Sequence, residues 1–565
     1  MNPIEVDPVK SLVFLAVFFP VTAAMASLAF MLIRRWHWLD IITPIFSLLS
    51  LLATLLLTVV YEKPVFLSFN RFNLQLVYID SVSVYFMLLV NLVTFVVSWY
   101  FVSYLRYDKL HNPYHRPAFF HLLFNSFHVT MLVVPIMGNL ILLWIAVELT
   151  TVVSTVLVRY RRDRRALEAS WKFIIITTTG IIFALLGTLI VAYSISSVEG
   201  HGLDQTGWDP MSWSALVSPK IVGLLDKEYL RLAFVFILIG YGTKAGLAPM
   251  HTWLPDGHGE APSPVSALLS GVMLKSALYA ILRFYTLTNL VLDDQAKYTS
   301  SLLLLAGLTS LVLSTPLILK HNRFKRVLAY HSLEHMGIIT FGLGIGTTAA
   351  LFGALLHALN HAVTKALMFT TYGYTHQQYT DQILGHAKKT LEENDVSGVW
   401  KAMPATGSIL AIGGLALVGS PPFNIFMSEF IILWAAVQKL LPTTGAAASL
   451  GVVGRRSAAA GTLDIPSLSN GVVQIFWSIA VLIFLASVSL IFVGMVRHLS
   501  RLLLGPAPFS SIESGLSNFR PLLPFLILLS LVALFGVWVP NVPWLLPLQE
   551  ILQNSTQILM TGPLP

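Results

Sequence analysis

The sequence contains no cysteine. This absence excludes disulfides, thiolate metal sites and cysteine-ligated iron–sulfur clusters within the chain. The sequence also has no Walker A motif, no GxGxxG motif after a predicted strand and no CxxC pair. These motifs are the short signatures of nucleotide and redox-centre binding. We therefore expect no cofactor and no resident metal in this chain.

Charged residues are also scarce. Only 11% of the 565 residues are charged, whereas 56% are hydrophobic and the mean hydropathy is +0.75. This composition predicts an all-α polytopic membrane protein surrounded by the lipid bilayer. The net charge of +8 would also suit a nucleic-acid-binding protein. The basic residues lie in short loops, however, where they are typical of membrane topology, so no nucleic-acid partner is expected.

Apolar runs long enough to cross a bilayer contain about 17–25 residues. Fourteen runs qualify: 11–33, 38–61, 79–105, 118–137, 139–159, 171–196, 230–249, 264–289, 299–319, 325–345, 348–374, 404–438, 472–496 and 519–540. The first run is too long for a signal-peptide core, and no small-residue cleavage site follows it, so we interpret it as a span. Pro135, Gly138 and Asn139 predict a tight turn between the fourth and fifth spans.

The basic residues predict the orientation of these spans. The loops on one side hold 21 lysines and arginines and those on the other side hold 10, with four more inside spans. The richer side is expected to be cytoplasmic. Both termini are then predicted on the outer side of a bacterial or archaeal plasma membrane.

Two spans are predicted to be broken. Span seven carries Gly246 and Pro249, and span twelve, 404–438, carries GSPPF with Pro421 and Pro422. Proline removes a backbone donor, and irregular backbone at membrane depth must line a protein-enclosed or wet cavity. Span twelve follows span seven by five spans. Because five is odd, the two spans cross the membrane in opposite directions, as corresponding helices do in inverted-repeat transporters. The predicted units are 1–117, three N-terminal helices; 118–289 and 290–497, two inverted five-helix repeats; and 498–565, the last helix and tail.

The stretch from Tyr241 to Arg283 organises the chain. It contains Lys244 and Lys275, each inside an apolar run, on either side of the broken segment. Lysine at membrane depth is costly and usually serves ion or proton movement. Four polar residues lie at the inner end of span seven and form either a proton entrance or hydrated loop positions: His251, Asp256, His258 and Glu260.

Glu148 lies in a long apolar run and is expected to find a cationic partner, most naturally Lys244. Because charge at one group changes the proton affinity of the next, movement of Glu148 relative to Lys244 would switch proton release toward Lys275. We hypothesise an electrostatic relay through these three residues. A structural buried ion pair is the alternative for Glu148 and Lys244, and snorkelling is the alternative for Lys275.

Spans ten and eleven carry a histidine cluster. His331 and His335, His357 and His361, and His361 and Lys365 are each four residues apart and share a helix face. Histidine titrates near neutrality and suits a proton chain. Metal chelation, with Glu334 as the carboxylate near in sequence, and isolated core histidines are the alternatives. Glu429 follows the break in span twelve and either ends the path or caps a half-helix.

The stretches WIAVELTT, ALEASWKF, GYGTKAGLAPMHTWLPDGHGEAPSPVSALLSG, HSLEHMGIITFGLG and LLHALNHAVTKALMF resemble the antiporter-like proton-channel family. This family includes membrane subunits of complex I, Mrp antiporters and group 4 hydrogenases, and the likeness is greatest to hydrogenase-4 component F. It runs through roughly residues 120–435. It implies fourteen helices, inverted repeats and outward termini. By motif, it assigns the proton-path acid to Glu148, the lysines to Lys244 and Lys275, the histidine axis to His331, His335, His357 and His361, and the exit acid to Glu429.

This chain departs from the resembled proteins in three ways. Component F proteins often lack a lysine at the Lys275 position, the 439–471 loop is long, and no long lateral helix follows span fourteen. We expect a proton-translocating subunit, not an enzyme by itself, coupled to a hydrogenase-like or complex I-like partner. The alternatives are the membrane half of a CO2/bicarbonate accumulator with a zinc carbonic-anhydrase-like partner, and a free cation/proton antiporter. Few carboxylates lie at depth, which favours H⁺ over Na⁺.

Overall fold

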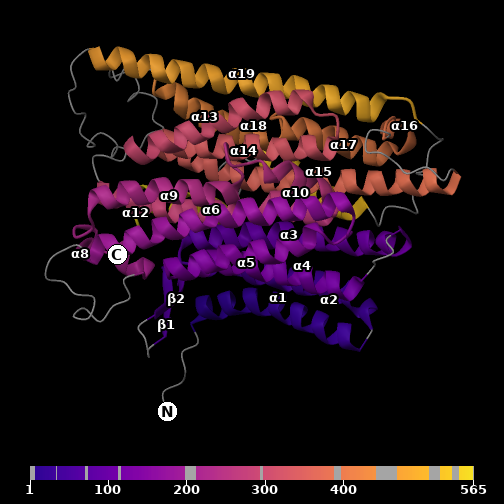
Figure 1. Cartoon of the computed structure of the whole chain (residues 1–565), viewed down its shortest axis with the longest axis horizontal. Coiled ribbons are helices and arrows are strands. Elements are labelled where there is room, and N and C mark those ends of the chain that lie inside the picture. The colour runs from indigo at the N-terminus through magenta and orange to yellow at the C-terminus, as the bar shows by residue number, and fades with distance from the viewer. Residues whose placement is uncertain are drawn as a thin grey trace.

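The computed structural model describes residues 7–33, 35–69, 74–111, 116–196, 211–292, 297–386, 396–440, 468–507, 522–537 and 546–563. Its long helices lie side by side in roughly one direction, with α1 and α2 at one edge of the bundle and α19 along the opposite edge (Figure 1). The protein is an all-α polytopic membrane protein whose middle helices are enclosed by the outer ones.

The N-terminal half begins with paired helices and one hairpin. Its elements are α1 (Pro8–Leu32), η1 (Trp36–Trp38), α2 (Leu39–Val60), β1 (Val65–Phe69), β2 (Leu74–Ile79), α3 (Ser81–His111), α4 (Pro117–Val133), η2 (Val134–Ile136), α5 (Leu140–Val158) and α6 (Arg164–Ser196). The turn predicted between the fourth and fifth spans is present. There Asn139 caps α5 by accepting from the N–H groups of Ile141 and Leu142 at 2.8 and 3.2 Å.

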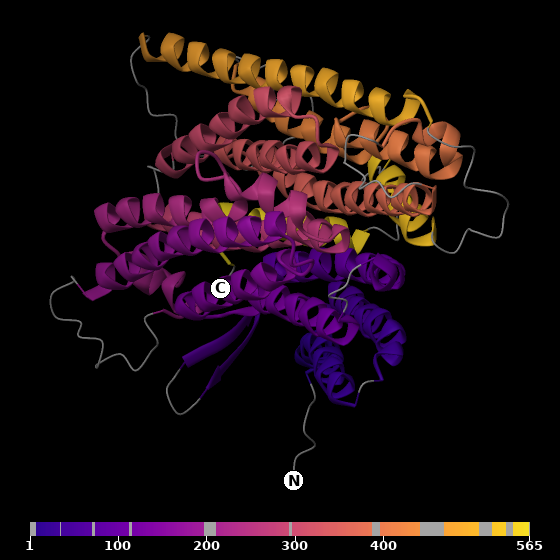
Figure 2. The same cartoon turned by 45° about the vertical axis from the view of Figure 1, so that its right-hand side comes forward.

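The two strands pair antiparallel and lie beside the N-terminal part of the bundle (Figure 2). The sequence analysis left this segment as a connection between spans. The hairpin is held to the α4–α5 turn, where the Gly138 N–H donates to the Leu76 carbonyl at 3.0 Å. A Cβ on Gly138 would lie 2.8 Å from the Gln75 side chain, so the close approach needs glycine.

The middle of the chain holds the most enclosed helices. Its elements are α7 (Trp213–Leu216), α8 (Pro219–Val222), α9 (Lys227–Ala245), α10 (Trp253–Glu260), α11 (Ser263–Leu268), the π-helical turn η3 (Leu269–Met273), α12 (Leu274–Leu292), α13 (Lys297–Lys320), α14 (Phe324–Ile345) and α15 (Thr348–His386). Every residue in the most apolar window of Ser263–Leu292 is buried inside the protein by its other helices. This segment is therefore the core of the bundle.

The last part of the chain wraps this core. Its elements are α16 (Val399–Ala402), α17 (Pro404–Leu417), α18 (Asn424–Gln438), α19 (Leu468–Leu504), α20 (Leu523–Val537) and α21 (Leu546–Thr561). Helix α21 packs against α3, α15 and α12 and follows the last predicted span. Its 16 residues have too little continuous apolar sequence for our span criterion, which is why the sequence analysis did not predict it.

Both predicted helix breaks coincide with interruptions in the structure. Helix α9 ends at Gly246, whose φ is +76°, and α10 starts after Pro249. The freed N–H of Ala248 donates to Ser310 Oγ at 3.0 Å, so this donor is satisfied inside the bundle. Helices α17 and α18 flank the second break, where Gly419 has a φ of +68°.

Among the described residues, nine helices are long and apolar enough to cross a membrane by length and composition, and three shorter apolar helices accompany them. Fourteen crossings and the inverted repeats stay predictions, as do the unit boundaries. Several helices run past the predicted limits. Helix α15 continues from the predicted end at 374 to His386, and Tyr379 packs there by donating to the Ser397 carbonyl at 2.7 Å. Apolar runs locate the hydrocarbon-depth part of a helix, whereas the helix itself extends beyond it.

Candidate functional site

The first group of predicted residues lies where α5, α6 and α9 meet. Glu148 is half-buried, and its carboxylate accepts hydrogen bonds from Thr151 and Thr178, each at 3.0 Å. Lys244 Nζ donates to the same Thr151 hydroxyl. Glu148 and Lys244, which the sequence suggested as partners, are thus linked through one hydroxyl. The i,i+3 spacing of Glu148 and Thr151 places both on one face of α5.

The surroundings of Lys244 explain how a lysine is held there. Lys244 occupies the last turn of α9, where the helix carbonyls favour a cation. Its ammonium lies 5.3 Å from the centre of the Phe173 ring. The residue is fully buried, so these contacts take the place of hydration. The break at Gly246 ends α9 directly after this position.

Lys275 belongs to a different set of contacts. Its ammonium donates to the Ser270 carbonyl at 2.8 Å and contacts Nδ1 of His361. Ser270 lies in η3, and a π-helical turn alters the backbone pairing locally and is common at functional positions. The hydrogen bonds of Lys244 and Lys275 therefore run to different partners. Their direct coupling stays a prediction.

The predicted histidines come together in one buried chain between α14 and α15. The rings of His361 and His335 lie 4.7 Å apart, centre to centre. His335 Nδ1 and His357 Nε2 are 3.0 Å apart and share a hydrogen bond. On its other side, His357 Nδ1 lies 3.0 Å from Ser428 Oγ on α18. All three histidines are fully buried, so the chain runs through the protein interior.

Glu429 lies at the α18 end of this chain. Its carboxylate and one nitrogen each of His335 and His357 lie within 4.8 Å of one another. The break in span twelve makes room for it, because a Cβ built on Gly419 would be 2.3 Å from Glu429 Oε2. Gly419 is thus needed both for its positive φ and for the space that the carboxylate occupies.

Glu334 has a larger part in the site than the sequence suggested. Its carboxylate lies 2.7 Å from His331 Nδ1 and is buried. Lys365, on α15, donates to the Leu328 carbonyl at 2.5 Å and lies 6.0 Å above the Phe369 ring. The i,i+3 spacing of His331 and Glu334 in one span is the sequence feature from which their contact could have been predicted.

Two triplets of buried ligands have spacings that could hold a metal ion: His331, Glu334 and His335, and His335, His357 and Glu429. In both triplets, ring nitrogens already pair at hydrogen-bond distance, 2.7 Å in the first and 3.0 Å in the second. Lys275 contacts the same histidine cluster, and a buried ammonium there disfavours a divalent cation. We therefore interpret the cluster as a chain of hydrogen bonds and one ring contact, between His361 and His335, and not as a metal site.

The four residues suggested as a proton entrance separate into two environments. Asp256 pairs with Lys172 at 3.1 Å and with Arg326 at 2.6 Å. Glu260 lies 3.3 Å from Arg323 and 3.6 Å from Arg326, so both acids belong to one partly exposed ionic cluster. His251 is half-buried, and His258 is fully buried against Trp253 and Phe369. His258 therefore belongs to the interior and not to a hydrated loop.

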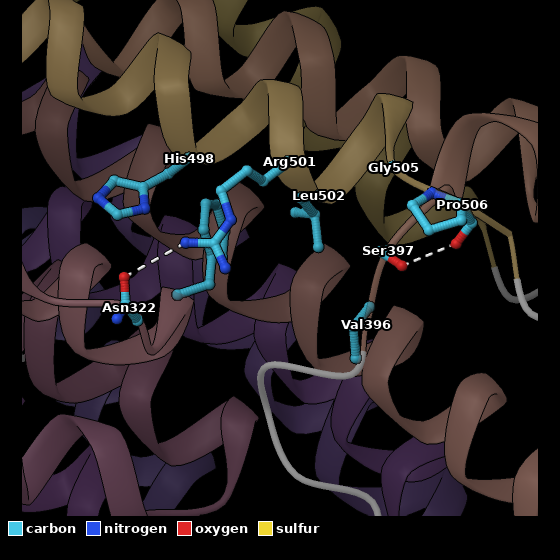
Figure 3. Close-up of a pocket in the computed structure, with 9 residues that line it drawn as sticks. Asn322, Val396, Ser397, His498, Arg501, Leu502, Gly505 and Pro506 are labelled. Atoms are coloured by element: carbon cyan, nitrogen blue, oxygen red, sulfur yellow. Dashed lines mark hydrogen bonds between the residues drawn. The ribbon is translucent and has the colours of Figure 1, made fainter.

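A cavity of about 260 Å³ opens at the end of α19, next to the loop between α13 and α14. Figure 3 shows Arg501 directed toward Asn322, with a separation of 3.3 Å, and Ser397 bonded to Pro506. His498 lines the same cavity and contacts the Ile318 carbonyl at 2.9 Å.

The sequence analysis counted Arg283 inside a span but assigned it no partner. Its guanidinium pairs with Asp80 at 2.5 and 2.8 Å and is also bonded to Ser83 and Tyr279. The rings of Tyr78, Trp213 and Tyr279 lie 5.5, 4.9 and 4.8 Å from it. This buried pair joins α12 to the start of α3. Asp80 and Arg283 are 203 residues apart in the sequence, so local sequence patterns could not predict this pair.

Both the sequence and the fold of this chain are similar to those of known proteins. The model of the family "NADH:quinone oxidoreductase/Mrp antiporter, TM" matches residues 137–453. The chain is 35% identical to a hydrogenase-4 component F homolog of Methylacidiphilum infernorum over 422 residues, covering 74% of this chain and 82% of that protein. Its fold is similar to a chain of the archaeal membrane-bound sulfane sulfur reductase, with a TM-score of 0.72 and 22% identity over 98% of this chain and 99% of that one. A chain of the Mrp complex from Dietzia sp. DQ12-45-1b gives a TM-score of 0.73 at 16% identity and 97% coverage of both.

Proposed function

Because this chain belongs to the NADH:quinone oxidoreductase/Mrp antiporter membrane family, we propose that it moves protons across the membrane as a subunit of a larger complex. The observation that carries the proposal is the buried sequence of contacts from Lys275 through His361, His335 and His357 to Ser428. Ammonium, imidazole and hydroxyl groups all exchange protons, and here one ammonium, three imidazoles and one hydroxyl follow one another without a carboxylate between them.

The chemistry of each link supports proton transfer. A neutral imidazole accepts a proton at one nitrogen and releases one from the other, so His335 and His357 can pass a proton onward without moving far. Lys275 can supply a proton to His361, which it contacts directly. Glu429 lies within reach of His335 and His357 and would receive the proton at the α18 end.

Glu148 and Lys244 form the input part of this proposal. Protonation of Glu148 would remove the anion that stabilises the Lys244 ammonium through Thr151. Lys244 would then release its proton more readily toward the interior. Among the residues that the structure describes, Lys244 and Lys275 share no hydrogen-bonding partner. In this proposal, proton transfer from Lys244 to Lys275 therefore requires a conformational change or a bound water molecule.

Protons fit this chain better than Na⁺. Sodium is a hard cation that prefers several oxygen ligands, whereas the central links here are imidazole nitrogens and ammonium groups. Buried ammonium groups would also repel a bound Na⁺. We therefore take H⁺ as the transported ion.

The partner is proposed from the relatives. One is a hydrogenase-4 component F homolog, and the sulfane sulfur reductase is a respiratory membrane complex. These names favour a redox module as the coupled partner over a zinc carbonic-anhydrase-like protein. The chain itself would then conduct protons without being the enzyme. Because one structural neighbour is a chain of an Mrp complex, cation/proton exchange is the alternative function that an experiment must distinguish from proton transport coupled to a redox partner.

The experiment is proton uptake by liposomes that contain the purified chain together with its co-purifying subunits. His335→Gln should reduce proton uptake per turnover of the partner to background, because it interrupts the buried chain. His37→Gln, at an exposed position, serves as the matched control and should keep wild-type uptake. Full uptake by His335→Gln would overturn the proposed path. Nickel or iron–sulfur centres in the co-purifying material would identify a redox partner. Zinc in one large soluble co-purifying protein would instead identify the chain as a subunit of a CO2/bicarbonate accumulation complex.

A further inference from the structure

Two adjoining cavities lie at the end of the bundle where α4 begins and α5 ends. The smaller, of about 250 Å³, is lined by Arg116, Phe119, Val156, Arg159, Tyr160 and Arg162. The larger, of about 570 Å³, is lined by Phe30, Met31, Trp36, Arg116, Pro117, Ala118 and Phe119. Arg116 and Phe119 line both cavities, so the two adjoin, and we describe them together as one depression with a basic part and an apolar part.

The basic part is suited to a phosphate group. Three arginines line this cavity, and no aspartate or glutamate is among the lining residues in the part of the chain that the structure describes. Arginine binds phosphate through paired N–H donors, and such charge-assisted contacts are stronger than neutral ones. Arg116 and Arg159 are exposed, which leaves their charges accessible from the membrane surface.

The backbone at Arg162 is a second indication. Its φ is +57°, and it is the one non-glycine residue with a positive φ among the residues that the structure describes. A side chain in this conformation costs about 1–2 kcal/mol for most residues, and such strain is concentrated at functional positions. Here the strained turn after α5 directs the chain so that Arg162 joins Arg159 at the cavity.

The apolar part indicates what the phosphate is attached to. Phe30 and Met31 lie in the last turn of the spanning helix α1, and Trp36 lies in the turn that follows. Tryptophan is typical of the boundary between hydrocarbon and headgroups. A basic cavity at this depth that opens into an apolar one matches a molecule with an anionic head and a hydrocarbon chain.

We propose that this depression binds one anionic phospholipid, with its phosphate between Arg116 and Arg159 and one acyl chain along Phe30, Met31 and Phe119. The site is separate from the histidine chain and does not depend on proton transport. An acidic segment of another protein would need no apolar cavity beside the arginines, so the lipid fits both parts of the depression better.

Native mass spectrometry of the delipidated full chain tests the proposal. The chain is titrated with dioleoyl phosphatidylglycerol and, separately, with dioleoyl phosphatidylcholine, which has the same acyl chains but no net charge. We expect one phosphatidylglycerol to be retained preferentially. Arg116→Gln/Arg159→Gln should weaken its binding about tenfold or more, since each arginine contributes a charge-assisted hydrogen bond.

The matched control is Arg164→Gln/Arg165→Gln. It removes the same charge from exposed positions of the same basic run, outside both cavity linings, and should change binding less than twofold. Both variants are checked for wild-type elution and helix content. Equal weakening by the two variants, or no preference for phosphatidylglycerol, would overturn the proposal. Equally tight binding of glycerol 3-phosphate would also overturn it, because the site would then recognise phosphate without the lipid.

Discussion

Lys275 of α12 and His361 of α15 are direct hydrogen-bonding partners, although 86 residues separate them. The Ser270 carbonyl accepts a second hydrogen bond from the same ammonium at 2.8 Å. Lys275 thereby joins the π-helical turn to the start of the histidine chain. Its removal would leave the chain without its cationic end.

Lys275→Ala is expected to abolish proton uptake per partner turnover while the protein still folds, because the proton donor to His361 is lost. Uptake by proteoliposomes measures the first effect, and the elution profile and helix content measure the second. Lys220→Ala, which changes an exposed lysine, should behave as wild type. Undiminished coupling in Lys275→Ala would contradict the assignment.

Thr151→Val is expected to lower the rate of proton uptake by about tenfold, since a hydrogen bond to a charged group contributes about 1.5–3 kcal/mol. Valine keeps the shape of threonine but removes the hydroxyl that connects Lys244 with Glu148. Thr151→Ser restores a hydroxyl and should recover most of the rate. A comparison of the two variants separates the hydroxyl's effect from packing, and equal rates would argue against the link.

Gly419→Ala is expected to lower both thermal stability and proton uptake. The added Cβ meets the Glu429 carboxylate, and the positive φ costs about 1–2 kcal/mol for an L side chain. Gly223→Ala is the control, because its Cβ has its nearest neighbour at 4.0 Å and its φ is negative. Thermal unfolding in detergent should distinguish the two, and similar melting temperatures would contradict the steric argument.

Asp80→Asn is expected to destabilise the protein by about 3–5 kcal/mol, because it leaves the Arg283 guanidinium buried without its anion. Asp7→Asn removes the acid of an exposed pair with Lys10, which should change stability by less than about 1 kcal/mol. Thermal denaturation of both variants checks the difference. If Asp80→Asn unfolds like wild type, the pair has no structural importance.

The sequence predicted the features that depend on local chemistry. Proline and glycine marked both helix breaks, and i,i+4 spacing grouped the histidines before any distance was known. It also selected Lys244 and Lys275, since each is surrounded by apolar residues. These inferences needed only the residues within one or two helical turns.

The sequence did not predict contacts between distant segments. Asp80 lies at the edge of a span and Arg283 within another, and nothing in either segment identifies the other as its partner. Thr151 was one of many hydroxyl residues, and its role as a bridge depends on how the fold brings Lys244 of α9 to α5. The hairpin of β1 and β2 was missed because its strands, of five and six residues, lie in the short segment that the sequence analysis left as a connection between two spans.

The Thr151 hydroxyl has one hydrogen, which points to Glu148 while its lone pair faces the Lys244 ammonium. If Glu148 becomes protonated and Lys244 neutral, both neighbours exchange roles, and the hydroxyl must turn to donate in the opposite direction. The orientation of a single O–H bond then records which of the two groups carries the proton. Such a rotor turns without any movement of the helices, so the site can change state before the rest of the protein responds.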